Sequence, residues 1–171
     1  IGFLVGDMVL DKDGIISGVR FMEILAYLDY KKQTIDDFLF ELKKQFGVFK
    51  TLQWHIRFAG FDADEKMCKL MQKIRLISSN ELADTLKINN IKKFDLENST
   101  GPYENMHGNV VIFENKDDFR LIIRPSGTEP KIKFYLETMN NNPVGDIKSL
   151  KEALCIKNQH YKKSIEKLFL D

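Results

Sequence analysis

The fold is decided by residues 119–138, which read FRLIIRPSGTEPKIKFYLET. On both sides of the central PSGTEP segment, apolar and polar side chains alternate with a period of two, as they do in strands that bury one face. The prolines and the glycine of that segment favour a turn. We therefore predict an antiparallel hairpin with strands at 119–124 and 132–138.

Further elements extend this hairpin in both directions. Residues 110–114 predict a third strand, and residues 115–117 predict the turn that joins it to the hairpin. Upstream, the pattern predicts a strand at 51–58, a helix that ends near residue 77, a short helix that starts at a Ser78/Glu81 capping box, and a strand at 91–96. A long helix starts near Asp146. This order predicts an α+β fold in which helices cover one face of an antiparallel sheet.

The first fifty residues differ in pattern from the rest. Residues 14–28 place apolar side chains on more than one face of a helix, which is typical of a helix covered on several sides. A second helix has Thr34 and Asp37 as a capping box and Gly47 at its end. Nothing else in this region supplies enough surface to cover the first helix, and the chain begins at Ile1. We expect residues 1–48 to be a fragment of a larger domain and residues 49–171 to be a second domain.

The composition excludes several classes of protein. The 171 residues carry 26 basic and 25 acidic side chains, a net charge of +1, and are 43% hydrophobic, which excludes a disordered or collagen-like chain. No apolar run reaches the roughly 18 residues of a membrane helix. Two distant cysteines favour a reducing compartment, so we expect a cytoplasmic protein. Without an overall excess of charge, any anion site has to be local.

Basic side chains gather on one face of the predicted hairpin. If Arg124 faces Lys131, the alternation places Arg120, Arg124, Lys131 and Lys133 on one face, together with Ile122 and Tyr135, and the other apolar residues on the opposite face. Like charges that oppose each other across strands destabilise a sheet. A bound dianion, shared by Arg124, Lys131 and Lys133, would explain the cluster.

The loop between the two strands adds hydrogen-bond donors. Ser126 and Thr128 bring hydroxyls, and Gly127 lets the backbone come close to a ligand or adopt positive φ, so that successive N–H groups form an anion-binding nest. Glu129 suits a ligand that also offers hydroxyl donors, as a sugar phosphate does. The same residue types occur in ordinary surface turns, and lysines also protect exposed strands, so a purely structural hairpin stays open as an alternative.

The run from Ile123 to Glu137 closely resembles the phosphate-binding loop in the C-terminal domain of the α-D-phosphohexomutases, which include phosphoglucomutases and phosphomannomutases. Residues 1–3, 6–7 and 11–14 resemble the stretch that follows the sugar-reading loop in the third domain of that family. The resemblance implies that residues 1–48 are the end of an α/β domain three. It also implies that residues 49–171 are domain four, whose sheet is similar to that of the TATA-box-binding protein.

The resemblance also implies an activity. It is that of an isomerase that interconverts hexose 1-phosphate and hexose 6-phosphate through a phosphoserine and a bisphosphate intermediate, with Mg²⁺ and a hexose 1,6-bisphosphate activator. The catalytic serine, the metal loop and the sugar-reading glutamate are expected upstream of Ile1. We therefore expect the fragment alone to be inactive, to hold no metal, and to have upstream domains of the same polypeptide as partners. The residues carried over as contacts to the substrate phosphate are Arg124, Ser126, Gly127, Thr128 and Lys133, with Lys131 as a weaker candidate.

Three alternatives remain at this point. Within the same superfamily, the loop is also similar to that of phosphopentomutase and glucose-1,6-bisphosphate synthase. A basic hairpin on an antiparallel sheet could instead bind nucleic acid, although we expect neither nucleic acid nor membrane as a partner. A purely structural domain is the third alternative. The histidines and cysteines are spaced too far apart to predict a zinc site.

Overall fold

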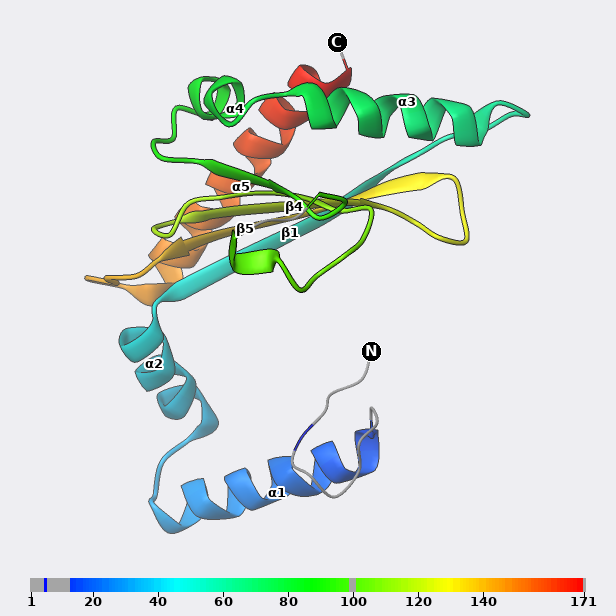
Figure 1. The fold of residues 1–171 in the computed structure, drawn as a ribbon. Coiled ribbons are helices and arrows are strands. Elements are labelled where there is room, and N and C mark those ends of the chain that lie inside the picture. Colours follow the sequence, from blue (N-terminus) through cyan, green and yellow to red (C-terminus); the bar gives the residue numbers. More distant parts are fainter. Residues whose placement is uncertain (1–4, 6–12, 99–100, 171) are drawn as a thin grey trace. The chain divides into compact units, whose positions relative to one another are not determined.

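The structure, a computed structural model, describes residue 5 and residues 13–98 and 101–170 (Figure 1). The chain divides into two compact units, Ile1–Phe46 and Gly47–Asp171. This division lies two residues before the predicted boundary, because Val48 is fully buried as the first residue of a strand in the second unit.

The first unit contains helices α1 (Gly14–Tyr30) and α2 (Ile35–Phe46). The predicted capping box of α2 is confirmed, because the Thr34 hydroxyl donates to the Asp37 carboxylate (2.6 Å) and accepts from the Asp37 N–H (3.1 Å). Hydrogen bonds from the Thr34 side chain and backbone hold the pKa of Asp37 below its ordinary value. The motif residues of 1–12 lie outside the described residues, and the assignment of this unit to an α/β domain stays a prediction.

The second unit is built on a five-stranded antiparallel sheet. The hairpin and the third strand next to it are confirmed. The strand at 51–58 begins earlier than predicted, because residues 48–50 continue the pairing with β5. In the sheet the order is β1-β5-β4-β3-β2, so the first and last strands of the sequence lie side by side. The strands are β1 (Val48–Arg57), β2 (Lys92–Asp95), β3 (Val111–Glu114), β4 (Phe119–Pro125) and β5 (Lys131–Asn140).

Three α-helices of the second unit pack on the sheet: α3 (Ala63–Leu76), α4 (Ser79–Leu86) and α5 (Ile147–Leu170). The Ser78 side chain accepts from the Glu81 N–H (3.1 Å), which confirms the predicted start of α4. Asp146 accepts hydrogen bonds from the N–H and the hydroxyl of Ser149 and so starts α5 at the predicted place.

All three helices cover the same face of the sheet, as predicted. Alternate strand residues point to that face and are buried against apolar side chains of the helices. A buried hydrogen bond from Thr138 on β5 to Asn158 on α5 (2.7 Å) adds a polar contact between the two layers. The core includes Trp54, Phe113, Phe119, Leu121, Phe134, Ile74, Leu82, Ile165 and Phe169.

We call the other face of the sheet the open face. It carries Arg120, Ile122 and Arg124 of β4 and their partners on the neighbouring strands. A segment that contains the short 3₁₀ helix η1 (Gly101–Tyr103) is fixed to this face, because the Tyr103 hydroxyl donates to Glu114 and accepts from Arg120, both at 3.0 Å. This segment belongs to the 98–108 loop, to which the sequence assigned no chemistry.

Candidate functional site

The register of the β4–β5 hairpin differs by two residues from the predicted one, and the loop between the strands is shorter. The Ser126 N–H donates to the Lys131 carbonyl (2.8 Å), and Arg124 pairs with Lys133 rather than with Lys131. Pro125 explains this register, because it has no N–H and occupies a position between two hydrogen-bonded pairs. A shift of two residues leaves every side chain on its predicted face.

Arg124 and Lys133 therefore lie directly opposite each other with their side chains on the open face. Arg124 is exposed and Lys133 is half-buried. Within the part of the chain that the structure describes, neither side chain forms an ion pair. Two opposed cations without a carboxylate between them repel each other, and an anion bound by both would remove that repulsion.

The loop after Arg124 offers donors that no group in the described part of the chain uses. Among the described residues, the N–H groups of Gly127, Thr128 and Glu129 donate to no protein acceptor, and the hydroxyls of Ser126 and Thr128 have no hydrogen-bond partner. The loop residues from 127 to 129 are exposed. These groups can bind the oxygens of an anion without breaking any bond of the fold.

Gly127 does not have the backbone conformation that the sequence suggested as one possibility. Its φ is not positive, unlike those of Gly47, Gly60 and Gly145. No atom lies within 4 Å of the position that a Cβ would occupy. The backbone of Gly127 is therefore open to the close approach of a ligand, the other possibility that the sequence suggested.

Lys131, the weaker candidate, is paired within the protein. Its amine lies 2.8 Å from the Glu129 carboxylate, which is also 3.5 Å from the guanidinium of Arg57. The hydrogen bond from Lys131, together with the positive charges of Lys131, Arg57 and Lys133, lowers the pKa of Glu129. Glu129 is therefore ionised at neutral pH and offsets part of the positive charge at the edge of the site.

Strand β1 contributes two basic residues that the sequence analysis did not assign to the site. His55 pairs with Lys133, and Arg57 pairs with Lys131. Both are exposed and alternate with the inward-facing Trp54 and Ile56. This alternation was readable in the sequence, but nothing local indicates that residues 48–57 pair with residues 131–140.

A pocket of about 470 Å³ adjoins the loop. It lies between α3, the end of the 98–110 segment and the start of the hairpin loop. Its size is within the range of small-molecule sites. The lining residues are Met67, Asn109, Val110, Arg124, Pro125, Ser126 and Gly127.

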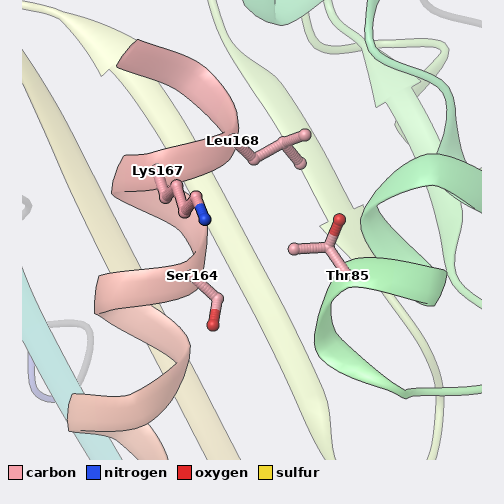
Figure 2. A pocket seen from close by; sticks show the side chains of 4 residues that line it. All are labelled: Thr85, Ser164, Lys167 and Leu168. Carbon is pink, nitrogen blue, oxygen red and sulfur yellow. The ribbon is translucent and has the colours of Figure 1, made fainter. Parts of the chain in front are cut away.

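A different pocket lies between α4 and α5, where Thr85, Ser164, Lys167 and Leu168 line it (Figure 2). The Thr85 hydroxyl donates to the Glu81 carbonyl (2.8 Å), so the free polar groups come from Ser164 and Lys167. None of the predicted site residues lines this pocket. It is a groove in the helical layer and offers no cluster of donors like that of the hairpin.

The described residues do not fit a metal centre. Among them, no group of three or more His, Cys, Asp or Glu side chains could hold a metal ion. No helix formed by the described residues has the length and apolar character needed to cross a membrane.

The sequence of the second unit matches a C-terminal domain of the mutase type, and its fold agrees with that class. Residues 72–149 match the family described as phosphoglucomutase/phosphomannomutase, C-terminal domain. The structure is similar to the crystal structure of parafusin (pp63), a phosphoglucomutase from Paramecium, in its open form. The similarity covers 96% of this chain and 29% of that protein, with a TM-score of 0.56 and 16% identity.

Curated relatives agree with this class. The chain is 32% identical over 144 residues to a probable phosphomannomutase of Haemophilus influenzae. This aligned region covers 84% of this chain and 27% of that protein. It is 26% identical to a probable phosphoribomutase of Schizosaccharomyces pombe (90% of this chain, 28% of that protein). It is also 26% identical to human glucose 1,6-bisphosphate synthase (90% of this chain, 26% of that protein). Residues 72–149 belong to the phosphoglucomutase/phosphomannomutase C-terminal domain family, and the matched part of the chain spans about a quarter of the length of these curated relatives.

Proposed function

We propose that the β4–β5 hairpin binds the phosphate of a sugar phosphate that is not being transferred, in an enzyme that interconverts hexose 1-phosphate and hexose 6-phosphate. The observation that carries this proposal is the pairing of Arg124 with Lys133 on the open face, with no carboxylate bound to either among the described residues. Ser126, Gly127 and Thr128 add hydroxyl and backbone donors beside the two cations.

The site acts by positioning. Phosphoryl transfer depends mainly on in-line placement of the reacting groups and on neutralisation of charge. A hairpin that grips one phosphate holds the rest of the sugar in place while the other end reacts. Because the bisphosphate intermediate must turn over between the two half-reactions, the same grip has to accept either end, which favours recognition of the phosphate over recognition of the ring.

The remaining chemistry is assigned to other parts of a longer polypeptide. The relatives are about three times as long as this chain, which supports further domains that supply the phosphoserine. Mg²⁺ and the hexose 1,6-bisphosphate activator are assigned to the same longer enzyme, because the described residues offer no group of side chains that fits a metal ion. We expect the 171-residue chain alone to show no mutase turnover.

The sugar is not decided by the hairpin. Relatives named for phosphoribose and for glucose 1,6-bisphosphate match the chain over nine tenths of its length. A pentose phosphate mutase and a glucose 1,6-bisphosphate synthase are therefore the second candidates within the family. All three activities need the same grip on a phosphate.

The test is an NMR titration of the ¹⁵N-labelled chain with inorganic phosphate, glucose 1-phosphate and duplex DNA. We expect both phosphate compounds to shift the amide signals of Gly127, Thr128 and Glu129, and we expect Arg124→Ala to abolish these shifts. Lys116→Ala, in the exposed turn before β4, is the matched control. Absence of shifts in the loop would indicate a structural hairpin, and tight DNA binding with a steep salt dependence would indicate a nucleic-acid-binding module.

A further inference from the structure

Three neighbouring strands place one basic residue each in a single row across the open face. Arg124 on β4 pairs with Lys133 on β5, and Lys133 pairs on its other side with His55 on β1. Side chains of directly paired residues point to the same face of a sheet. The outer two positions are two strand spacings apart, roughly 10 Å between Cα atoms. An anion above Lys133 is thus within reach of the arginine from one side and the imidazole from the other.

The charged groups around His55 are almost all positive. Arg57 lies on the same strand and face, and Lys131 and Lys133 face it from β5. Glu129, the carboxylate of the hairpin loop, already forms ion pairs with Lys131 and Arg57. Toward the start of β1, the next pair on this face is Gln53 with Tyr135, and the pair after it is Thr51 with Glu137. Glu137 is also paired with Arg120 on β4. His55 therefore has no carboxylate partner in its own row.

We propose that His55 is a third side chain that contacts the bound phosphate, and that its protonated form strengthens phosphate binding. This inference rests on the proposed function of the hairpin. An exposed imidazole beside Lys133 can donate an N–H to a phosphate oxygen that Arg124 and Lys133 do not use. Histidine is the type of side chain whose charge changes between about pH 5 and pH 8, so a histidine contact adds a pH-dependent contribution to phosphate binding.

The test follows the imidazole signals of the 171-residue chain while inorganic phosphate is added. The three histidines are His55, His107 and His160. His55→Gln identifies the His55 signal, and His160 on α5 provides a reference within the same spectrum. We expect phosphate to shift the His55 signal and to leave that of His160 unchanged.

The phosphate affinity of His55→Gln gives the second readout. We expect it to fall about three- to ten-fold near pH 6 and less than about two-fold near pH 8, since only the protonated imidazole adds a charge. Gln53→Ala, on the same strand and face but in the next row, should bind phosphate like the wild type at both pH values. Thermal unfolding of both variants shows whether the fold is kept.

The outcomes separate this inference from the function on which it depends. If the wild type binds phosphate through Arg124 but His55→Gln binds equally well at both pH values, the role of His55 is wrong and the hairpin site stands. If His55→Lys binds phosphate more tightly than the wild type near pH 8, the role of a positive charge at this position is supported. If the wild type does not bind phosphate at all, both the proposed function and the role of His55 are wrong.

Discussion

The amine of Lys131 donates a hydrogen bond of 2.8 Å to the carboxylate of Glu129, within the loop that carries the candidate phosphate site. The same carboxylate lies 3.5 Å from Arg57 on the neighbouring strand. One acidic residue thus neutralises part of the charge of two basic residues at the edge of a cluster. At its centre, Arg124 and Lys133 form no ion pair or hydrogen bond with a carboxylate among the described residues.

Replacing Glu129 with Gln should strengthen the binding of inorganic phosphate about two- to five-fold, the scale of one exposed charge interaction. The change removes a negative charge and frees Lys131 and Arg57 to interact with the ligand. The gain should be smaller for glucose 1-phosphate if Glu129 also accepts hydrogen bonds from sugar hydroxyls. Calorimetric titration with both ligands measures this, and Glu152→Gln on α5 is the control. Weaker phosphate binding in Glu129→Gln would contradict the prediction.

Replacing Gly127 with Ala should separate binding from stability. Because φ is not positive and the space for a Cβ is empty, we expect the free energy of unfolding to stay within about 0.5 kcal/mol of the wild type. Phosphate affinity should fall about ten-fold, since a methyl group stands where the ligand approaches the backbone. Urea unfolding and phosphate titration are the two measurements. Unchanged affinity would show that no ligand comes close to this residue.

Replacing Gly47 with Ala should destabilise the sheet at the start of β1. The residue has a φ of +97°, and an added Cβ would lie 2.7 Å from the Asn140 carbonyl oxygen. We expect a loss of about 1–3 kcal/mol, as for other residues forced into this backbone region. Gly108→Ala is the control, because the nearest atom to its Cβ position lies 3.9 Å away. Equal unfolding midpoints for the two variants in urea would overturn this expectation.

Replacing Asn158 with Ala should loosen the contact between α5 and the sheet. Its side chain accepts from Thr138 (2.7 Å) and donates to the Lys50 carbonyl (2.9 Å), and it is 1% exposed. The substitution removes the partner of the buried Thr138 hydroxyl and a hydrogen bond to the part-buried Lys50 carbonyl, for an expected cost of about 2–4 kcal/mol. Gln159→Ala, at the next and exposed position of α5, should cost less than about 0.5 kcal/mol. A small loss in Asn158→Ala would mean that water replaces both bonds.

Local features of this fold were predictable because they depend on neighbours in the sequence. The capping boxes at Thr34 and Ser78 and the alternation along β4 and β5 each involve residues a few positions apart. The hairpin register was predicted wrongly by two residues. The observed register depends on which backbone groups can form hydrogen bonds between the strands, and Pro125 has no N–H that could donate one.

The sequence by itself determined the alternating strands, the face to which each basic side chain points, and the loop that marks the family. Only the tertiary structure decided that β1 lies beside β5 and brings His55 and Arg57 to the hairpin. The physical reason is that strand alternation is a property of the local backbone. The choice of a neighbouring strand about 80 residues away instead depends on how the whole sheet buries its apolar face against the helices.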